Sequence, residues 1–86
     1  MQRFKKIYKQ VIEEGKTSIS FEDLRFLLNK IGFKERCKGD HFIFTLEGIN
    51  EIINLQPDGK SAKKYQVKQV RQIVTKYKLG GNSDEE

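Results

Sequence analysis

The sequence predicts an α+β domain, in which a three-stranded antiparallel sheet has helices on one face and the elements follow the order α-α-β-β-β-α. Two patterns indicate this fold. Apolar residues recur at helical spacing near both ends of the chain, whereas the middle is rich in β-branched and aromatic residues divided by turn dipeptides. Short turns imply an antiparallel meander, and helices with one apolar stripe each must cover one face of it. The chain of 86 residues is long enough for one domain and too short for two.

The first two helices are predicted on either side of Gly15, which is suited to a C-terminal cap. A helix over residues 3–14 has an apolar stripe formed by Phe4, Ile7, Tyr8, Val11 and Ile12. Ser20 then offers an N-cap oxygen, with Asp23 three residues later as a variant of the capping box. Gly32 is suited to end the second helix, whose stripe consists of Phe21, Leu24, Leu27, Leu28 and Ile31.

The middle of the chain is predicted to form the three strands. A first strand over residues 34–38 is followed by the turn dipeptide Gly39-Asp40, and a second strand covers residues 41–46. A third strand over residues 49–56 ends at Pro57, which cannot donate to a ladder. Because successive side chains of a strand alternate between its faces, the core-facing residues of the second strand should be Phe42, Phe44 and Leu46.

A basic loop and a last helix over about residues 66–78 complete the domain, which we expect to span residues 1–79. The apolar stripe of this helix is formed by Val67, Val70, Ile73, Val74 and Tyr77. Residues 80–86 should form a disordered acidic tail. Without the first helix, the element order is that of a double-stranded-RNA-binding domain, so residues 20–79 would form such a core.

The charge of the chain is unevenly distributed. The net charge is +5, yet residues 1–59 carry ten basic and nine acidic side chains, whereas residues 60–78 carry seven basic side chains and no acidic one. Such a segment attracts polyanions, above all nucleic acid, although a solvated helix face would have the same composition.

Composition also excludes some functions and suggests a location. The single cysteine, Cys37, cannot form an intramolecular disulfide or a cysteine-based zinc site, and this fits a reducing cytosol. The most apolar stretch is too short to span a bilayer, and no apolar run of signal-peptide length follows the basic N-terminus. We therefore expect a cytoplasmic protein without a membrane segment, a metal or a small-molecule cofactor.

His41 is the only histidine and the main candidate for chemistry. It opens the second strand, and alternation directs it to the face without helices, together with Ile43 and Thr45. An imidazole ordinarily exchanges its proton near neutral pH, so it can act as a general acid or base. An exposed or turn-capping histidine without chemistry is the alternative for any single histidine.

The residues around His41 resemble a known signature. The glycine–small polar–histidine–x–x–aromatic motif of HicA-type mRNA interferases is similar to the stretch Lys38-Gly39-Asp40-His41-Phe42-Ile43-Phe44. Residues 52–57 and 64–71 resemble the third strand and final helix of part of that family, so the resemblance covers residues 18–79. The commonest motif has serine where this chain has Asp40, and the shortest members lack the first helix.

The resemblance implies a fold like that of the double-stranded-RNA-binding domain, mRNA cleavage by a type II toxin, and a HicB-type antitoxin as protein partner. It makes His41 the catalytic residue. Basic residues near the motif and in the last helix would contact the RNA backbone, and the predicted RNA-binding residues are Lys38, Gly39, Lys64, Lys68 and Arg71. Ile43 and Ile52, which we expect to pair on the open sheet face, would be the partner surface.

Two other functions remain open from the sequence. The protein could be a non-catalytic RNA-binding module in which His41 contacts only phosphate or ribose. It could also be a protein-interaction domain that uses the open sheet face without RNA.

Overall fold

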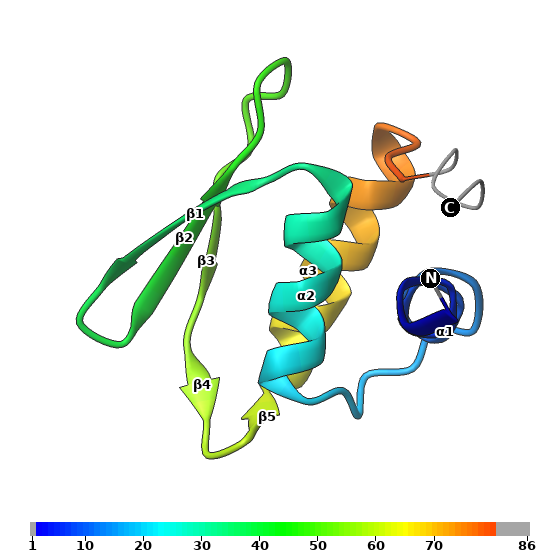
Figure 1. Ribbon diagram of the computed structural model, residues 1–86, viewed down its shortest axis with the longest axis horizontal. Helices are drawn as coiled ribbons and strands as arrows, with labels where there is room; N and C mark the ends of the chain where they lie inside the picture. Colours follow the sequence, from blue (N-terminus) through cyan, green and yellow to red (C-terminus); the bar gives the residue numbers. More distant parts are fainter. Residues whose placement is uncertain (1, 81–86) are drawn as a thin grey trace.

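The computed structural model describes residues 2–80 and has helices on one side of an antiparallel sheet (Figure 1). The predicted α+β class and the order of the main elements are confirmed. In chain order the elements are α1 (Gln2–Tyr8), the π-helix η1 (Lys9–Glu13), α2 (Phe21–Ile31), β1 (Lys34–Lys38), β2 (His41–Thr45), β3 (Ile53–Leu55), β4 (Pro57–Asp58), β5 (Ser61–Ala62) and α3 (Lys64–Lys76).

The main sheet has the strand order β1-β2-β3, with both pairs antiparallel. Phe44 of β2 lies opposite Ile53 of β3, and both side chains are fully buried beneath the helices. Helices α2 and α3 cover this face, and α1 packs on the far side of them from the sheet (Figure 1). Within residues 2–80, no helix lies over the opposite face of the sheet, as the alternation of apolar residues predicts.

The first helix differs from the prediction in its second half. It is α-helical only to Tyr8 and then continues as a π-helix, in which the Glu14 N–H donates to the Lys9 carbonyl at 2.9 Å. Phe4, Ile7 and Val11 are all buried, as predicted. The apolar spacing could not reveal the wider turn, because both helix types keep these three residues on one face.

The second helix begins and ends as predicted. The Asp23 N–H donates to the Ser20 side-chain oxygen at 3.1 Å, which satisfies one of the free amides of the first turn. At the other end Gly32 has a φ of 126°, and its N–H donates to the Leu28 carbonyl at 3.2 Å. A residue with a side chain would be strained in this conformation, so glycine is suited to end the helix.

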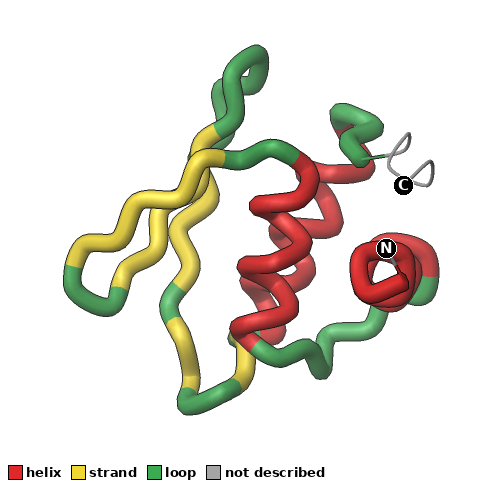
Figure 2. Tube along the Cα trace, in the orientation of Figure 1, coloured by secondary structure: helices red, strands yellow, loops and turns green. Residues whose placement is uncertain are grey.

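The third strand is shorter than predicted, because only residues 53–55 of the expected 49–56 pair with β2. The preceding residues form a loop, which Figure 2 shows between two strands of the main sheet. Glu51 in this loop accepts hydrogen bonds from Tyr77 at 2.6 Å and from Lys76 at 2.9 Å. These contacts hold the loop against the end of α3, so it does not continue the ladder.

The basic loop expected after Pro57 is also partly ordered, as the small hairpin β4–β5. Ser61 bridges to Ser20, and the Ala62 N–H donates to the Ile19 carbonyl at 3.0 Å, so the hairpin is tied to the start of α2. Helix α3 then begins at Lys64, two residues before the predicted start. Lys64 is therefore the first residue of the helix and does not belong to the loop.

The described chain extends one residue past the predicted end of the domain. The Tyr8 hydroxyl donates to the Leu79 carbonyl at 3.1 Å, and Gly80 lies against Tyr8 and Ile31. The rest of the predicted acidic tail, residues 81–86, lies outside the described residues. Within residues 2–80, no helix has the length and apolar character needed to cross a membrane.

Candidate active site on the open sheet face

The candidate site is built on the hairpin that joins β1 to β2. Lys38 and His41 are directly opposed, and Gly39 and Asp40 form the two-residue turn between them. Gly39 has a φ of 64°. Glycine at the first position of a two-residue turn is typical of hairpins in which the turn matches the right-handed twist of the two strands. The turn therefore places the Lys38 ammonium group and the His41 ring on the same face of the sheet.

The His41 ring is exposed and has a defined neighbour. Its side chain is 49% accessible, which confirms the predicted position on the face without helices. Its Nδ1 lies 3.1 Å from Oδ1 of Asn54, which projects from β3 on the same face. With the Asn54 amide in this orientation its carbonyl oxygen accepts, so Nδ1 is the donor in this contact. The neutral ring then has its lone pair on Nε2, the nitrogen that is free for proton transfer.

Asp40 lies on the Nε2 side of the ring, with its Oδ1 3.8 Å from Nε2. Its other oxygen accepts a hydrogen bond from Nε2 of Gln56 at 2.8 Å. This hydrogen bond is the main reason why the pKa of Asp40 lies below its ordinary value, with smaller contributions from its own backbone amide, from His41 and from Lys63. Asp40 is thus a carboxylate at neutral pH, next to Nε2 of His41.

A buried glutamine of α3 holds β3 in place beneath this site. Gln66 is only 3% exposed. In the amide orientation that satisfies both of its polar atoms, it accepts from the Gln56 N–H at 3.1 Å and donates to the Gln56 carbonyl at 3.2 Å. The side chain thereby pairs with the backbone at the end of β3 as a neighbouring strand would, and it fixes the part of the chain that carries Asn54 and Gln56.

The structure brings together only some of the predicted RNA-binding residues. Lys38 and Gly39 adjoin His41 in the hairpin. Lys64 and Lys68 are exposed on α3, which packs against the other face of the sheet. The guanidinium group of Arg71 lies beside Gly15, at the end of the first helix, so it is separated from His41 by the helical layer. Lys63, which the prediction did not single out, is close enough to Asp40 to lower its pKa.

The predicted pairing of Ile43 with Ile52 is wrong. Ile43 lies opposite Asn54, because the ladder aligns Phe44 with Ile53 and Phe42 with Leu55. Ile52 precedes β3 and is 60% exposed, whereas Ile43 is half-buried. Ile43 is on the open face of the sheet, whereas Ile52 lies in the loop before β3, so the two do not form a directly opposed pair.

Three residues that the sequence analysis did not assign to the site, Asn54, Gln56 and Gln66, complete it. A signal for the first two was present in the sequence, because burial of Ile53 and Leu55 directs Asn54 and Gln56, which alternate with them, to the face that carries His41. The sequence did not reveal the register between the second and third strands. This register makes Asn54 the neighbour of the His41 ring. Gln66 gave no signal beyond being a polar residue next to the apolar stripe of α3.

Among the described residues, no three His, Cys, Asp or Glu side chains come together in a group that could hold a metal ion. Comparisons with protein-family models, with curated proteins and with solved structures found no match for this chain. The class of the protein therefore rests on its own fold and on the geometry of its site. It is a small α+β domain whose helix-free sheet face carries one oriented, accessible imidazole.

Proposed function

We propose that this protein is an endoribonuclease of the HicA type, the toxin of a type II toxin–antitoxin pair, and that His41 is its catalytic residue. The observation that carries the proposal is the imidazole itself. It is exposed on the open sheet face, Asn54 orients it through Nδ1, and the ammonium group of Lys38 comes from the opposed position of the hairpin. The resemblance of residues 38–44 to the HicA motif supports the same function.

RNA supplies its own nucleophile for this reaction. The 2′-hydroxyl loses its proton to a base and attacks the adjacent phosphorus, and the bond from phosphorus to the 5′-oxygen breaks. The leaving oxygen takes up a proton, and the products are a 2′,3′-cyclic phosphate and a free 5′-hydroxyl. In the proposed reaction Nε2 of His41 accepts the first proton, and a positioned base of this kind contributes about 10²–10⁴ in rate. Lys38 stabilises the additional negative charge that develops on the phosphate oxygens.

The rest of the proposal concerns fold family, partners and location. The β-sheet flanked by α2 and α3 would be a variant of the double-stranded-RNA-binding domain with an added N-terminal helix. A HicB-type antitoxin would inhibit the toxin by covering the open face, where Ile43 lies two residues from His41 along β2, and the exposed Ile52 before β3 would offer a second apolar contact. Both proteins would act in the cytoplasm, where the toxin would cleave mRNA.

A non-catalytic RNA-binding module is the second candidate, and Asp40 is the observation that favours it. Its carboxylate lies 3.8 Å from Nε2 of His41, where a scissile phosphate would have to approach. Repulsion between the carboxylate and the phosphate would weaken productive binding. In a binding module, His41 would contact only phosphate or ribose, with Asp40 as a neighbour of the ring, and it would transfer no proton.

The two functions are separated by comparing the wild type with His41→Ala on a synthetic RNA strand. We expect the variant to lose at least about 100-fold in cleavage rate, as is typical when a general base is removed. A strand with a single 2′-deoxy substitution at the cleaved position should resist the wild type. Asn50→Ala, a change at an exposed loop residue, is the matched control.

Two results would contradict the nuclease function. One is cleavage by His41→Ala at the rate of the wild type. The other is cleavage of the 2′-deoxy strand at the substituted position, because no 2′-oxygen is available there. Binding of RNA without any cleavage by the wild type would support the binding module instead.

A further inference from the structure

The helix-free face of the sheet carries a row of cations along its edge strand β1. Lys34, Arg36 and Lys38 occupy alternate positions of the strand and are all exposed. Because a strand rises about 3.3 Å per residue, neighbours in this cation row are spaced by about 7 Å. The row ends at Lys38, directly opposite His41.

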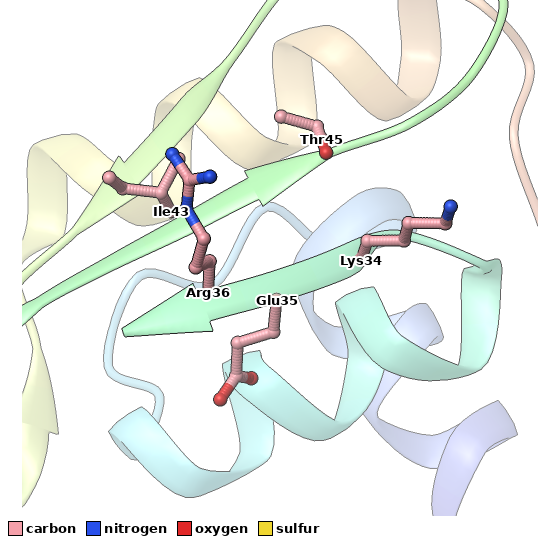
Figure 3. Close-up of a pocket in the computed structure, with 5 residues that line it drawn as sticks. All are labelled: Lys34, Glu35, Arg36, Ile43 and Thr45. Atoms are coloured by element: carbon pink, nitrogen blue, oxygen red, sulfur yellow. The ribbon is translucent and has the colours of Figure 1, made fainter. Parts of the chain in front are cut away.

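No carboxylate of β1 lies on the same face of the sheet as the cation row. Glu35, the acidic residue of this strand, points to the other side of the sheet, toward α2 (Figure 3). It accepts hydrogen bonds from Arg25 at 2.6 and 3.2 Å and from the Asn29 amide at 3.0 Å. Within residues 2–80, none of the ion pairs involves a member of the cation row. The positive charge of the row is therefore directed to solvent on the open face.

A groove of about 340 Å³ lies between the cation row and β2 and is lined by Lys34, Arg36, Ile43 and Thr45, and also by Glu35, whose carboxylate points to the other side of the sheet. Arg36 and Ile43 are directly opposed in the ladder, as are Lys34 and Thr45. Figure 3 shows the Arg36 guanidinium group next to the Ile43 side chain, on the side of the sheet away from Glu35. The groove thus combines a planar cation and an apolar side chain at its centre.

We propose that the groove and the cation row bind single-stranded RNA and direct it to His41. Successive phosphates of one strand lie along Lys34, Arg36 and Lys38, and a base enters the groove against Ile43 and the Arg36 guanidinium plane. This inference rests on the proposed nuclease function, and it names the substrate as an unpaired strand and gives its path across the protein. The path differs from the predicted RNA contacts of α3, which lies on the other face of the sheet.

An unpaired strand fits this face better than a duplex does. The row offers a single line of charges, which matches one backbone, whereas a duplex presents two backbones across a groove. Bases of a single strand can leave the stack and lie on an arginine plane, as they do in other single-strand-binding proteins. In a duplex the bases are paired and stacked, and none is free to enter the groove.

The test measures affinity for a single-stranded RNA in the His41→Ala background, so that cleavage does not interfere. The face variant combines Lys34→Gln with Arg36→Gln. The matched control combines Lys5→Gln with Lys6→Gln on exposed positions of α1, beyond the helical layer, and it removes the same charge. We expect the face variant to bind about tenfold more weakly, and its log–log salt slope to flatten by about 1.4, at about 0.7 per phosphate lost.

Three outcomes would overturn the inference. Equal losses in the two variants would mean that net charge alone attracts RNA. Unchanged affinity in the face variant would mean that RNA lies elsewhere or that the face serves a protein partner. Competition by a duplex of the same sequence as effective as that by the single strand would contradict the substrate class.

The nuclease function can fail separately. Cleavage by the wild type together with an unchanged affinity of the face variant would overturn only the binding path. Loss of affinity in the face variant without any cleavage by the wild type would overturn only the nuclease function.

Discussion

At His41, one hydrogen bond selects which ring nitrogen is available for proton transfer. The carbonyl oxygen of Asn54 can only accept from Nδ1, so the neutral ring keeps its lone pair on Nε2. Asp40 lies beside Nε2 and is itself held by Gln56. The arrangement of the site therefore depends on two amide side chains as well as on His41: Asn54 in β3, and Gln56 directly after the strand.

Asn54→Ala should release the ring from this orientation. We expect kcat to fall by up to about tenfold, because a neutral hydrogen bond of this kind contributes about 1 kcal/mol. KM should change little, since Asn54 is a positioning residue. Nitrogen NMR of the single histidine checks the cause directly, because the variant should populate both neutral tautomers. An unchanged tautomer in Asn54→Ala would mean that another group orients the ring, and Asn50→Ala is the control on an exposed loop.

At the scale of elements, the contact between α3 and β3 couples the helical layer to the site. Gln66 is the buried polar residue that makes this contact, and it satisfies both the N–H and the carbonyl group of Gln56. Only three residues of β3 pair with β2, so the short strand depends on this second attachment. A helix side chain therefore replaces the neighbouring strand that β3 lacks on its outer edge.

Gln66→Leu should destabilise the fold by about 1–3 kcal/mol, because it leaves the N–H and the carbonyl group of the half-buried Gln56 without this partner. The measurement is the free energy of unfolding in urea. Gln72→Leu is the matched control, since Gln72 lies on the exposed side of the same helix, and such a surface change should stay within about 0.5 kcal/mol. Equal free energies for the two variants would show that the Gln66 amide does not stabilise the attachment of β3.

At the scale of the whole molecule, several carboxylates join segments that are distant in the sequence. Glu35 joins β1 to α2, and its pKa is lowered chiefly by the hydrogen bond from Arg25. Glu51 joins the loop before β3 to the end of α3, and hydrogen bonds from Tyr77 and Lys76 lower its pKa to about 2. Each of these contacts requires the charged form of the carboxylate, so the arrangement of the fold is sensitive to acid.

Stability should accordingly fall as the solution is acidified. A carboxylate whose pKa is lower in the folded than in the unfolded chain stabilises the fold above its ordinary pKa of about 4. That contribution is lost as the pH falls through the folded value, here down to about 2 for Glu51. We expect the free energy of unfolding to decrease between about pH 4 and pH 2. Glu51→Gln should flatten this dependence by up to one proton, and an unchanged slope would contradict the role of Glu51.

The sequence by itself determined the features that depend on residues a few positions apart. The cap of α2 at Ser20 and the hairpin turn at Gly39 follow from local hydrogen bonding and backbone conformation. The exposure of His41 follows from alternation along β2, since Phe44 must be buried. In each case the sequence alone held the necessary information, because neighbours along the chain set the outcome.

Only the tertiary structure decided how distant segments meet. The register places Asn54, and not Ile52, opposite Ile43. The contacts of Glu51 with α3 shorten the third strand, and the packing of Arg71 beside Gly15 takes that cation away from His41. The physical reason is that these contacts join residues far apart in the chain. The free energy of these contacts depends on how the helices and the sheet pack together, and no local sequence pattern contains that information.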